Sequence, residues 1–205
     1  MAKRDISIKK RGRHVRNVKP VYLVIAEGKN KTEILYLSHF REQSKEYSLQ
    51  FVKAGYSTDA RSLYETISEK WDELDLSSEN GDKAFIILDI DNDLNKAKKV
   101  VELAKRNTNS AINFIVSNPA FEVWFLLHFK YTTRHYENAD AVIRDLKKFL
   151  PNYEKNRDCY LECVDLIQEA LVNVDKLAKY YEKLPWPSIE CNPMTDMGEL
   201  IKRLE

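Results

Sequence analysis

Cysteine is scarce in this sequence, and no zinc-binding pattern is present. The three cysteines, Cys159, Cys163 and Cys191, form no CxxC pair, and the four histidines are not spaced like ligands of structural zinc. This pattern excludes a structural zinc site and fits a protein that folds in a reduced cytosolic interior.

Long apolar segments and a nucleotide-binding loop are missing as well. No apolar run approaches the roughly 18 residues that cross a bilayer, and the polar N-terminus has no apolar signal-peptide region. We therefore expect a soluble, cytoplasmic protein without membrane contacts. Because no GxxxxGK[ST] motif occurs, any dependence on ATP must come from a partner.

Charge is balanced overall but is unevenly distributed. The chain has 33 Lys plus Arg against 32 Asp plus Glu. Residues 1–19 form a basic arm with eight basic residues and Asp5 as the one acidic residue. An arm of this kind often contacts nucleic-acid phosphates, although a solvated tail without a specific role explains it about as well.

Strand and helix patterns alternate along the chain. Expected strands cover residues 21–26, 50–53, 84–88 and 111–116, and expected helices cover 31–43, 58–74 and 95–106, followed by an apolar helix that Ser117-Asn118-Pro119 opens. This alternation predicts an α/β fold with a mostly parallel sheet flanked by helices. We expect the α/β core to span 20–134 and a helical C-terminal extension, 135–205, to pack on it.

Acidic residues follow two of the predicted strands. Glu27 and Gly28 end the first, and Asp89, Asp91 and Asp93 follow the run AFIIL. In a parallel sheet, ligands bind outside the carboxyl ends of the strands, so the two acidic turns converge if their strands are neighbours. Carboxylates held together need a cation, and Mg²⁺ prefers such oxygen ligands.

A purely structural interpretation also explains the aspartates. Asp and Asn are frequent in turns and at helix N-caps, and the segment 89–93 precedes a predicted helix, whose N-terminus favours negative charge. Glu27 favours the metal-site interpretation over the structural one, because Glu is not a preferred turn residue and Gly28 lets the backbone approach a ligand closely.

Four blocks of the sequence resemble a known family. They are EGKNKTE (27–33), LDIDND (88–93), SNPAFEVWFLLHF (117–129) and NPMTDMGELIKRL (192–204). Glu27 with Asp89-Ile90-Asp91 is similar to the glutamate and DxD pattern of the Toprim fold, which primases, topoisomerases and some nucleases share. All four blocks together resemble the RloB-like family of bacterial phage-defence proteins.

The resemblance implies a site and a biological setting. It implies Glu27, Asp89 and Asp91 as ligands of Mg²⁺ or Mn²⁺, with Asp93 as a weaker fourth ligand. It also implies a Toprim-like nuclease of abortive infection that works with an ATPase of the ABC or SMC-like AAA type.

Two ionisable residues lie within the apolar helix of the third block. Glu122 is one turn beyond a strand end, which makes it a candidate metal or water-positioning residue, although a structural carboxylate that pairs or caps explains it equally well. His128 points to a different face, since a helix turns about 100° per residue. It is expected to be a core histidine rather than a general acid or base.

Basic and aromatic residues offer further candidates. Lys31 and Thr32 stand at the start of a predicted helix, where anions are favoured, so they either hold a phosphate or are simply exposed. Lys155 is a candidate phosphate contact, with a plain surface lysine as the alternative. Aromatic residues that either stack bases or pack helices together are Tyr131, His135, Tyr136 and Tyr153.

These observations predict a Mg²⁺- or Mn²⁺-dependent phosphodiesterase that acts on RNA, including tRNA, or on DNA. Asp89 and Asp91 hold the metal, and Glu27 shares it or acts as the general base. The alternative is a non-catalytic subunit that an ATPase holds and releases, in which the apolar helix 119–129 is partly an interface. The oligomeric state is open.

Overall fold

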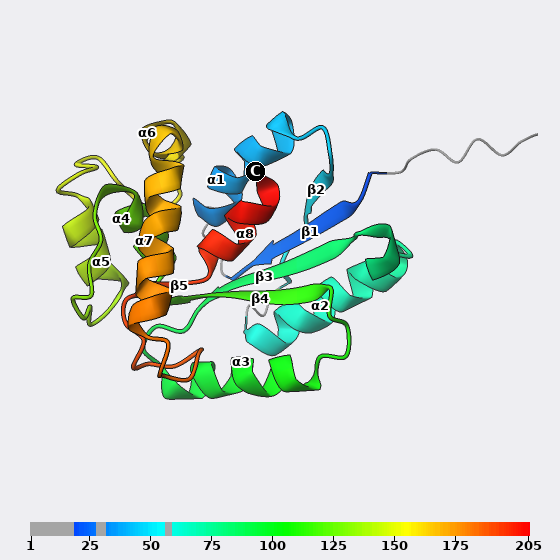
Figure 1. Ribbon diagram of the computed structural model, residues 1–205. Coiled ribbons are helices and arrows are strands. Elements are labelled where there is room, and N and C mark those ends of the chain that lie inside the picture. The colour runs from blue at the N-terminus through cyan, green and yellow to red at the C-terminus, as the bar shows by residue number, and fades with distance from the viewer. Residues whose placement is uncertain (1–18, 28–31, 56–58) are drawn as a thin grey trace, which may run out of the picture.

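A single five-stranded sheet organises the protein, and the computed structural model describes it over residues 19–27, 32–55 and 59–205. The strand order is β2-β1-β3-β4-β5 (Figure 1). The strands are β1 (Val21–Ala26), β2 (Ser48–Phe51), β3 (Lys83–Asp89), β4 (Ile112–Asn118) and β5 (Met194–Thr195). The first four are parallel, and β5 is antiparallel to β4. The predicted mostly parallel sheet is confirmed.

One face of the sheet packs against α2 (Ala60–Glu73) and α3 (Leu94–Arg106), which lie below it in Figure 1. Successive strand residues point to opposite faces, so Leu23 and Ile25 of β1 pack on this side. Both helices have apolar residues at helical spacing. Those of α2 that are buried here are Leu63, Ile67 and Trp71.

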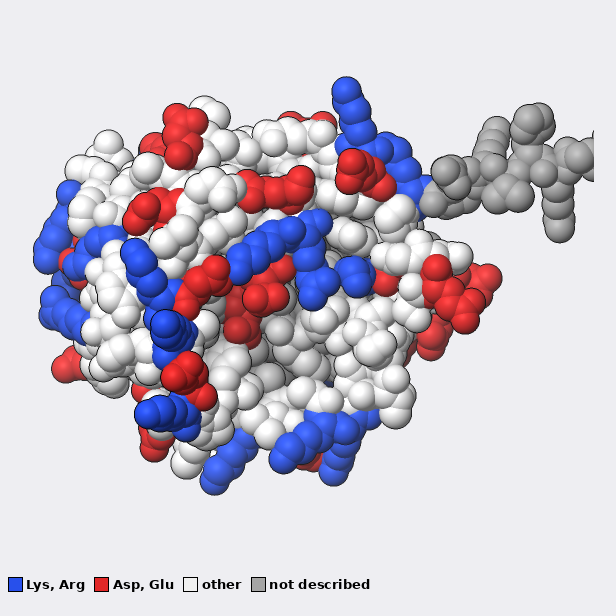
Figure 2. Space-filling model, in the orientation of Figure 1, with Lys and Arg blue, Asp and Glu red and all other residues white. Residues whose placement is uncertain are grey.

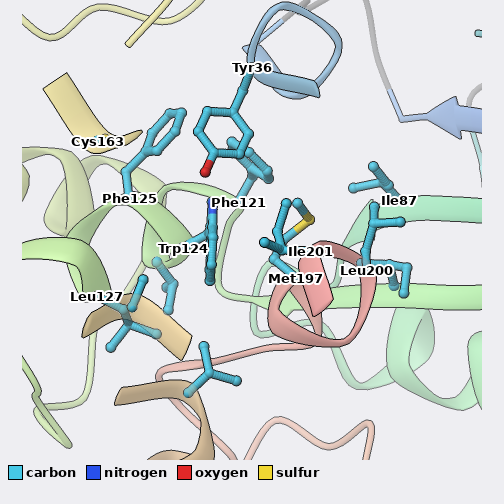
Figure 3. Close-up of a cluster of buried hydrophobic side chains, with 14 of the residues drawn as sticks. Tyr36, Ile87, Phe121, Trp124, Phe125, Leu127, Cys163, Met197, Leu200 and Ile201 are labelled. Atoms are coloured by element: carbon cyan, nitrogen blue, oxygen red, sulfur yellow. The ribbon is translucent and has the colours of Figure 1, made fainter. Parts of the chain in front are cut away.

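The other face is covered by α1 (Thr32–Gln43), α8 (Met197–Leu204) and, beyond them, α4 (Glu122–Phe129) and α7 (Ile167–Tyr180). Figure 3 shows Tyr36, Trp124 and Met197 reaching into one cluster from three of these helices. Every residue of α4 from Glu122 to His128 is buried, as expected of a helix that is apolar on nearly all sides. The helix is therefore a core element over these residues.

The C-terminal segment is helical and returns to the sheet. It contains α5 (Ala139–Leu146), α6 (Tyr160–Cys163), α7 and α8, while two short 3-10 helices, η1 (Ser78–Asn80) and η2 (Val164–Leu166), lie in connecting segments. Between α7 and α8 the chain adds β5 to the edge of the sheet. The division at residue 134 stays a prediction.

Two local predictions are wrong. β2 begins at Ser48, two residues before the predicted strand, and ends at Phe51. Ser117 and Asn118 belong to β4 instead of opening a helix, and α4 begins only at Glu122. Both residues pair with β5, at Thr195 and Met194, a long-range contact that the local sequence does not reveal.

None of the helices in the described ranges is long and apolar enough to cross a membrane.

Candidate metal centre

The two acidic turns meet at one edge of the sheet. β1 and β3 are hydrogen-bonded neighbours, with Ala26 opposite Ile87. Glu27 follows Ala26, and its N–H donates to the Ile87 carbonyl over 2.9 Å. Its Oε2 accepts the N–H of Asp89 over 3.2 Å. The expected convergence of Glu27 and Asp89 is therefore a property of the fold.

The turn after β3 has an unusual backbone. Asp91 and Asn92 both lie in the left-handed region, with φ of 51° and 57°. Asn and Asp tolerate this region better than other non-glycine residues, at a cost of roughly 1–2 kcal/mol each. Two hydrogen bonds hold the turn in place. The Asp91 N–H donates to the Pro119 carbonyl over 3.1 Å, and the Asn92 N–H donates to Asn118 Oδ1 over 3.0 Å.

Four carboxylates besides Glu27 surround a cavity of about 190 Å³ at this edge. The cavity is lined by Glu27, Thr32, Glu33, Ile87, Leu88, Asp89, Asp91, Glu122 and Lys155. Figure 2 shows acidic side chains gathered in a hollow of the molecule, over the region where β1 ends in Figure 1, with Lys and Arg along its rim.

Glu33 is one of the residues at this edge that the sequence interpretation missed. It lies in the first turn of α1, is only 9% exposed, and its Oε2 has no hydrogen-bond partner in the described part of the chain. Burial raises its pKa to about 7, and the negative charge of Glu122 adds to the effect. Its position at the end of the EGKNKTE block was the available signal.

Asp89 and Glu122 complete this acidic group. Burial raises the pKa of Asp89 well above its ordinary value, and the charges of Glu33, Glu122 and Asp91 raise it further. Glu122 is 4% exposed, and its Oε1 accepts the hydroxyl of Tyr153 over 3.0 Å. Burial and mutual repulsion therefore disfavour the charged forms of Glu33 and Asp89, and a bound cation would relieve this electrostatic cost.

Lys96, in the first turn of α3, is a cation that contacts both acidic turns. Its Nζ lies 2.9 Å from Glu27 Oε1, 2.7 Å from Asp91 Oδ2 and 3.4 Å from the carbonyl oxygen of Asp89. Burial lowers the pKa of Lys96, but the hydrogen bonds to Asp91 and Glu27 outweigh it, so the pKa lies above its ordinary value.

Asp93 serves another purpose in the structure. Its side chain caps α3 by accepting the N–H groups of Asn95 (2.7 Å) and Lys96 (3.3 Å). For Asp93, the structure therefore agrees with the interpretation that the segment 89–93 caps the following helix. Asp93 is not among the residues that line the cavity, and its role as a metal ligand stays a prediction.

Lys155 borders the cavity because its loop is tied to α1. The N–H of Asn156 donates to Thr32 Oγ1 over 2.9 Å, which brings the loop against the first turn of the helix. Lys155 is exposed and lines the cavity, a position suited to a phosphate contact. The other candidate, Lys31, lies outside the described residues, as does the basic arm up to residue 18.

The remaining candidates belong mostly to the core. His128 is 1% exposed, its Nδ1 lies 2.9 Å from the Trp124 carbonyl, and burial lowers its pKa to about 4. It is the core histidine that the sequence suggested. Tyr136 and Tyr153 are buried as well, so they pack helices and are not open to bases.

Comparison with known proteins identifies the family. A family model described as RloB-like protein matches residues 22–204. The chain belongs to the RloB-like family. No curated protein and no solved structure matches it.

In this RloB-like protein, three of the four blocks that carry the resemblance meet at the turn after β3. Asn92 Nδ2 donates to the carbonyls of Tyr136 and Glu137, each over 2.9 Å. Asn118 accepts the Asn92 N–H, and Asn192 donates to Asn92 Oδ1 over 2.6 Å. The second, third and fourth blocks thus fix the backbone that carries Asp91.

The donor set fits a hard divalent cation. All candidate ligands are carboxylates, as Mg²⁺ and Mn²⁺ prefer, and the buried Glu33 has an oxygen without a partner in the described ranges. As the described side chains stand, no three His, Cys, Asp or Glu residues converge closely enough to hold a metal. The Lys96 ammonium lies between Glu27 and Asp91.

Proposed function

We propose that this RloB-like protein is a divalent-cation-dependent phosphodiesterase with a Toprim-like site that acts on nucleic acid. The observation that carries the proposal is the cavity where Glu27, Glu33, Asp89, Asp91 and Glu122 meet. Keeping Glu33 and Glu122 buried beside Asp89 is costly for a protein that never binds a cation there.

The carboxylates form two overlapping groups. Glu27, Asp89 and Asp91 come from the two acidic turns, and Glu33, Asp89 and Glu122 come from α1, β3 and α4. Asp89 belongs to both groups, so we assign it the central role. A cation bound by either group would lower the pKa of an attacking water and neutralise charge on the phosphate.

The other residues have supporting roles in this proposal. Glu27 is 26% exposed at the mouth of the site and is suited to share the cation or to accept a proton from water. Lys155 supplies a positive charge at the rim for a phosphate oxygen. Tyr153 orients the Glu122 carboxylate through its hydroxyl.

The substrate and the setting are proposed from the family. We propose RNA, including tRNA, or DNA as the substrate, and a cytoplasmic effector of anti-phage abortive infection that works with an ABC or SMC-like AAA ATPase. The chain has no Walker A loop of its own, in line with an ATPase partner. Residues 1–19 would add salt-sensitive affinity for nucleic acid.

The alternative of a non-catalytic partner subunit has less support. Its expected interface, the apolar helix, is α4, and every α4 residue from Glu122 to His128 is buried inside the protein. A stable complex with the ATPase in gel filtration, together with no effect of metal on the free protein, would favour this alternative.

Calorimetric titration of Mg²⁺ and Mn²⁺ tests the proposal, with wild type and Asp89→Ala compared. Asp140→Ala, which removes an exposed aspartate in the first turn of α5, is the matched control. All three proteins are then incubated with bulk tRNA and with plasmid DNA. We expect Asp89→Ala to lose metal binding and cleavage while circular dichroism stays unchanged, and the control to keep both. Normal cleavage by Asp89→Ala would refute the mechanism.

Glu33→Gln tests whether the second carboxylate group also holds a cation. The substitution keeps the shape of the side chain and removes its charge. We expect it to lower the number of bound Mn²⁺ ions and to leave binding at Glu27, Asp89 and Asp91 in place. An unchanged stoichiometry would restrict the site to the two acidic turns.

A further inference from the structure

The ammonium group of Lys96 occupies the position between the two acidic turns where a bound metal cation is expected. Its ammonium lies within 3.4 Å of three oxygens that come from Glu27, Asp89 and Asp91. These acceptors stand on two turns that are more than 60 residues apart in the sequence. An ammonium has three N–H donors, so one lysine can engage all three oxygens at once.

The same oxygens are the expected ligands of a divalent cation at this edge. An ammonium and a divalent cation cannot share Glu27 Oε1 and Asp91 Oδ2, because like charges a few ångströms apart repel. Lys96 is 37% exposed and has a flexible four-carbon stem, so its head can leave the carboxylates without moving α3. Binding of the cation is therefore an exchange.

We propose that Lys96 is the internal counter-ion of this centre and that it sets the cation concentration at which the centre fills. In the metal-free protein its ammonium holds the two acidic turns together. When a divalent cation binds, the ammonium is displaced from Glu27 and Asp91. This inference rests on the proposed function, since it assumes that the acidic turns bind a cation.

Lys99 provides a matched control for Lys96. It lies one turn further along α3 and borders, with Lys96, an adjoining cavity of about 280 Å³. Its ammonium is 3.9 Å from Glu102, on its own helix, rather than on the acidic turns. Lys99→Met thus removes the same charge from the same helix and leaves the Glu27–Lys96–Asp91 contact in place.

The test compares wild type, Lys96→Met, Lys96→Arg and Lys99→Met by Mn²⁺ titration and by thermal melting in EDTA. Two partly exposed ion pairs are lost in Lys96→Met, so we expect Mn²⁺ to bind about tenfold more tightly. Lys96→Met should also melt at a lower temperature than wild type in EDTA, and its melting temperature should rise more than that of wild type when Mn²⁺ is added. Lys96→Arg keeps the charge and should restore wild-type affinity, and Lys99→Met should match wild type within about twofold.

The outcomes separate this inference from the proposed function. Equal or weaker Mn²⁺ binding by Lys96→Met would overturn the counter-ion role even if wild type binds metal and cleaves nucleic acid. Equal tightening in Lys99→Met would overturn it too, since net charge alone would then explain the effect. Tighter binding in Lys96→Met with no cleavage by wild type would support the exchange and contradict the nuclease.

Discussion

Asn192 Nδ2 donates a hydrogen bond to Asn92 Oδ1 over 2.6 Å, across 100 residues of sequence. Asn192 also donates to the Tyr136 carbonyl (2.8 Å) and accepts the Tyr136 N–H (3.0 Å). One side chain from the C-terminal segment therefore joins the loop before α5 to the acidic turn. The fourth sequence block supports the candidate metal centre without lining it.

Asn192→Ala should weaken both the fold and the metal centre. It removes the Asn192 partner of Asn92 Oδ1 and of the Tyr136 N–H in a buried setting, where unpaired polar groups cost roughly 1–3 kcal/mol. We expect the free energy of unfolding in urea to fall by about 2 kcal/mol and Mn²⁺ affinity to fall as well. Asn152→Ala, an exposed asparagine, should change neither quantity. If Mn²⁺ affinity is unchanged in Asn192→Ala, the fourth sequence block does not support the candidate metal centre.

Two substitutions at Asn92 distinguish the energetic cost of its backbone conformation from the contribution of its side-chain hydrogen bonds. Asn92→Ala and Asn92→Gly both lose the side-chain hydrogen bonds, but glycine adopts the φ of 57° without strain. Asn92→Ala should therefore be the less stable variant, by about 1 kcal/mol, in chemical unfolding. If alanine and glycine behave alike, backbone strain at this turn is not a significant cost.

The buried Asp145 should make stability depend on pH. Burial raises its pKa, but hydrogen bonds from Tyr136, Lys148 and Lys130 outweigh this effect, so the pKa lies below its ordinary value. A lowered pKa in the folded state contributes stability above the unfolded value of about 3.9, and that stability is lost as the pH falls below it. Asp145→Asn should cost about 2 kcal/mol at pH 7 and clearly less at pH 3.5, as measured by urea unfolding.

The control for that measurement is Asp140→Asn, an exposed position on the same helix, which should change the unfolding free energy by less than about 0.5 kcal/mol. A cost for Asp145→Asn that stays constant down to pH 3.5 would show that the charge of Asp145 is unimportant.

Gly198 lets α8 approach α7. A Cβ at this position would lie 3.0 Å from Val174 Cγ1, tighter than most packed side chains, so Val174 would have to shift. Gly198→Ala should therefore destabilise the protein by about 1 kcal/mol in spite of the better helix propensity of alanine. In a Val174→Ala background the same substitution should become stabilising. Gly55→Ala, with no heavy atom within 4 Å of the added Cβ, is the control.

Local patterns predicted most of the fold. Unbroken apolar runs marked β1 and β3, which are buried because helices cover both faces of the sheet. Apolar residues at helical spacing marked α2 within two residues, and the expected helix 95–106 matches α3 within one residue. The exceptions, the start of β2 and the segment 117–121, lie where strand pairing overrides local preference.

The candidate site was only partly predictable. Glu27 and the three aspartates stood out because charge directly after a buried strand is a local signal. Glu33 and Lys96 gave no such signal, since a charged residue in the first turn of a helix is ordinary. Their place at the site depends on which way each helix leaves the sheet.

The sequence by itself determined the alternation of strands and helices and the placement of Glu27 and Asp89 at strand ends, because both follow from short-range patterns of apolar and polar residues. The tertiary structure alone made β1 and β3 neighbours and brought Glu33 and Lys96 to this edge, beside Glu122, which the sequence had already offered as a candidate. The same holds for the bond from Asn192 to the acidic turn. Strand order and helix packing depend on how whole faces bury against each other, and no single segment carries that information.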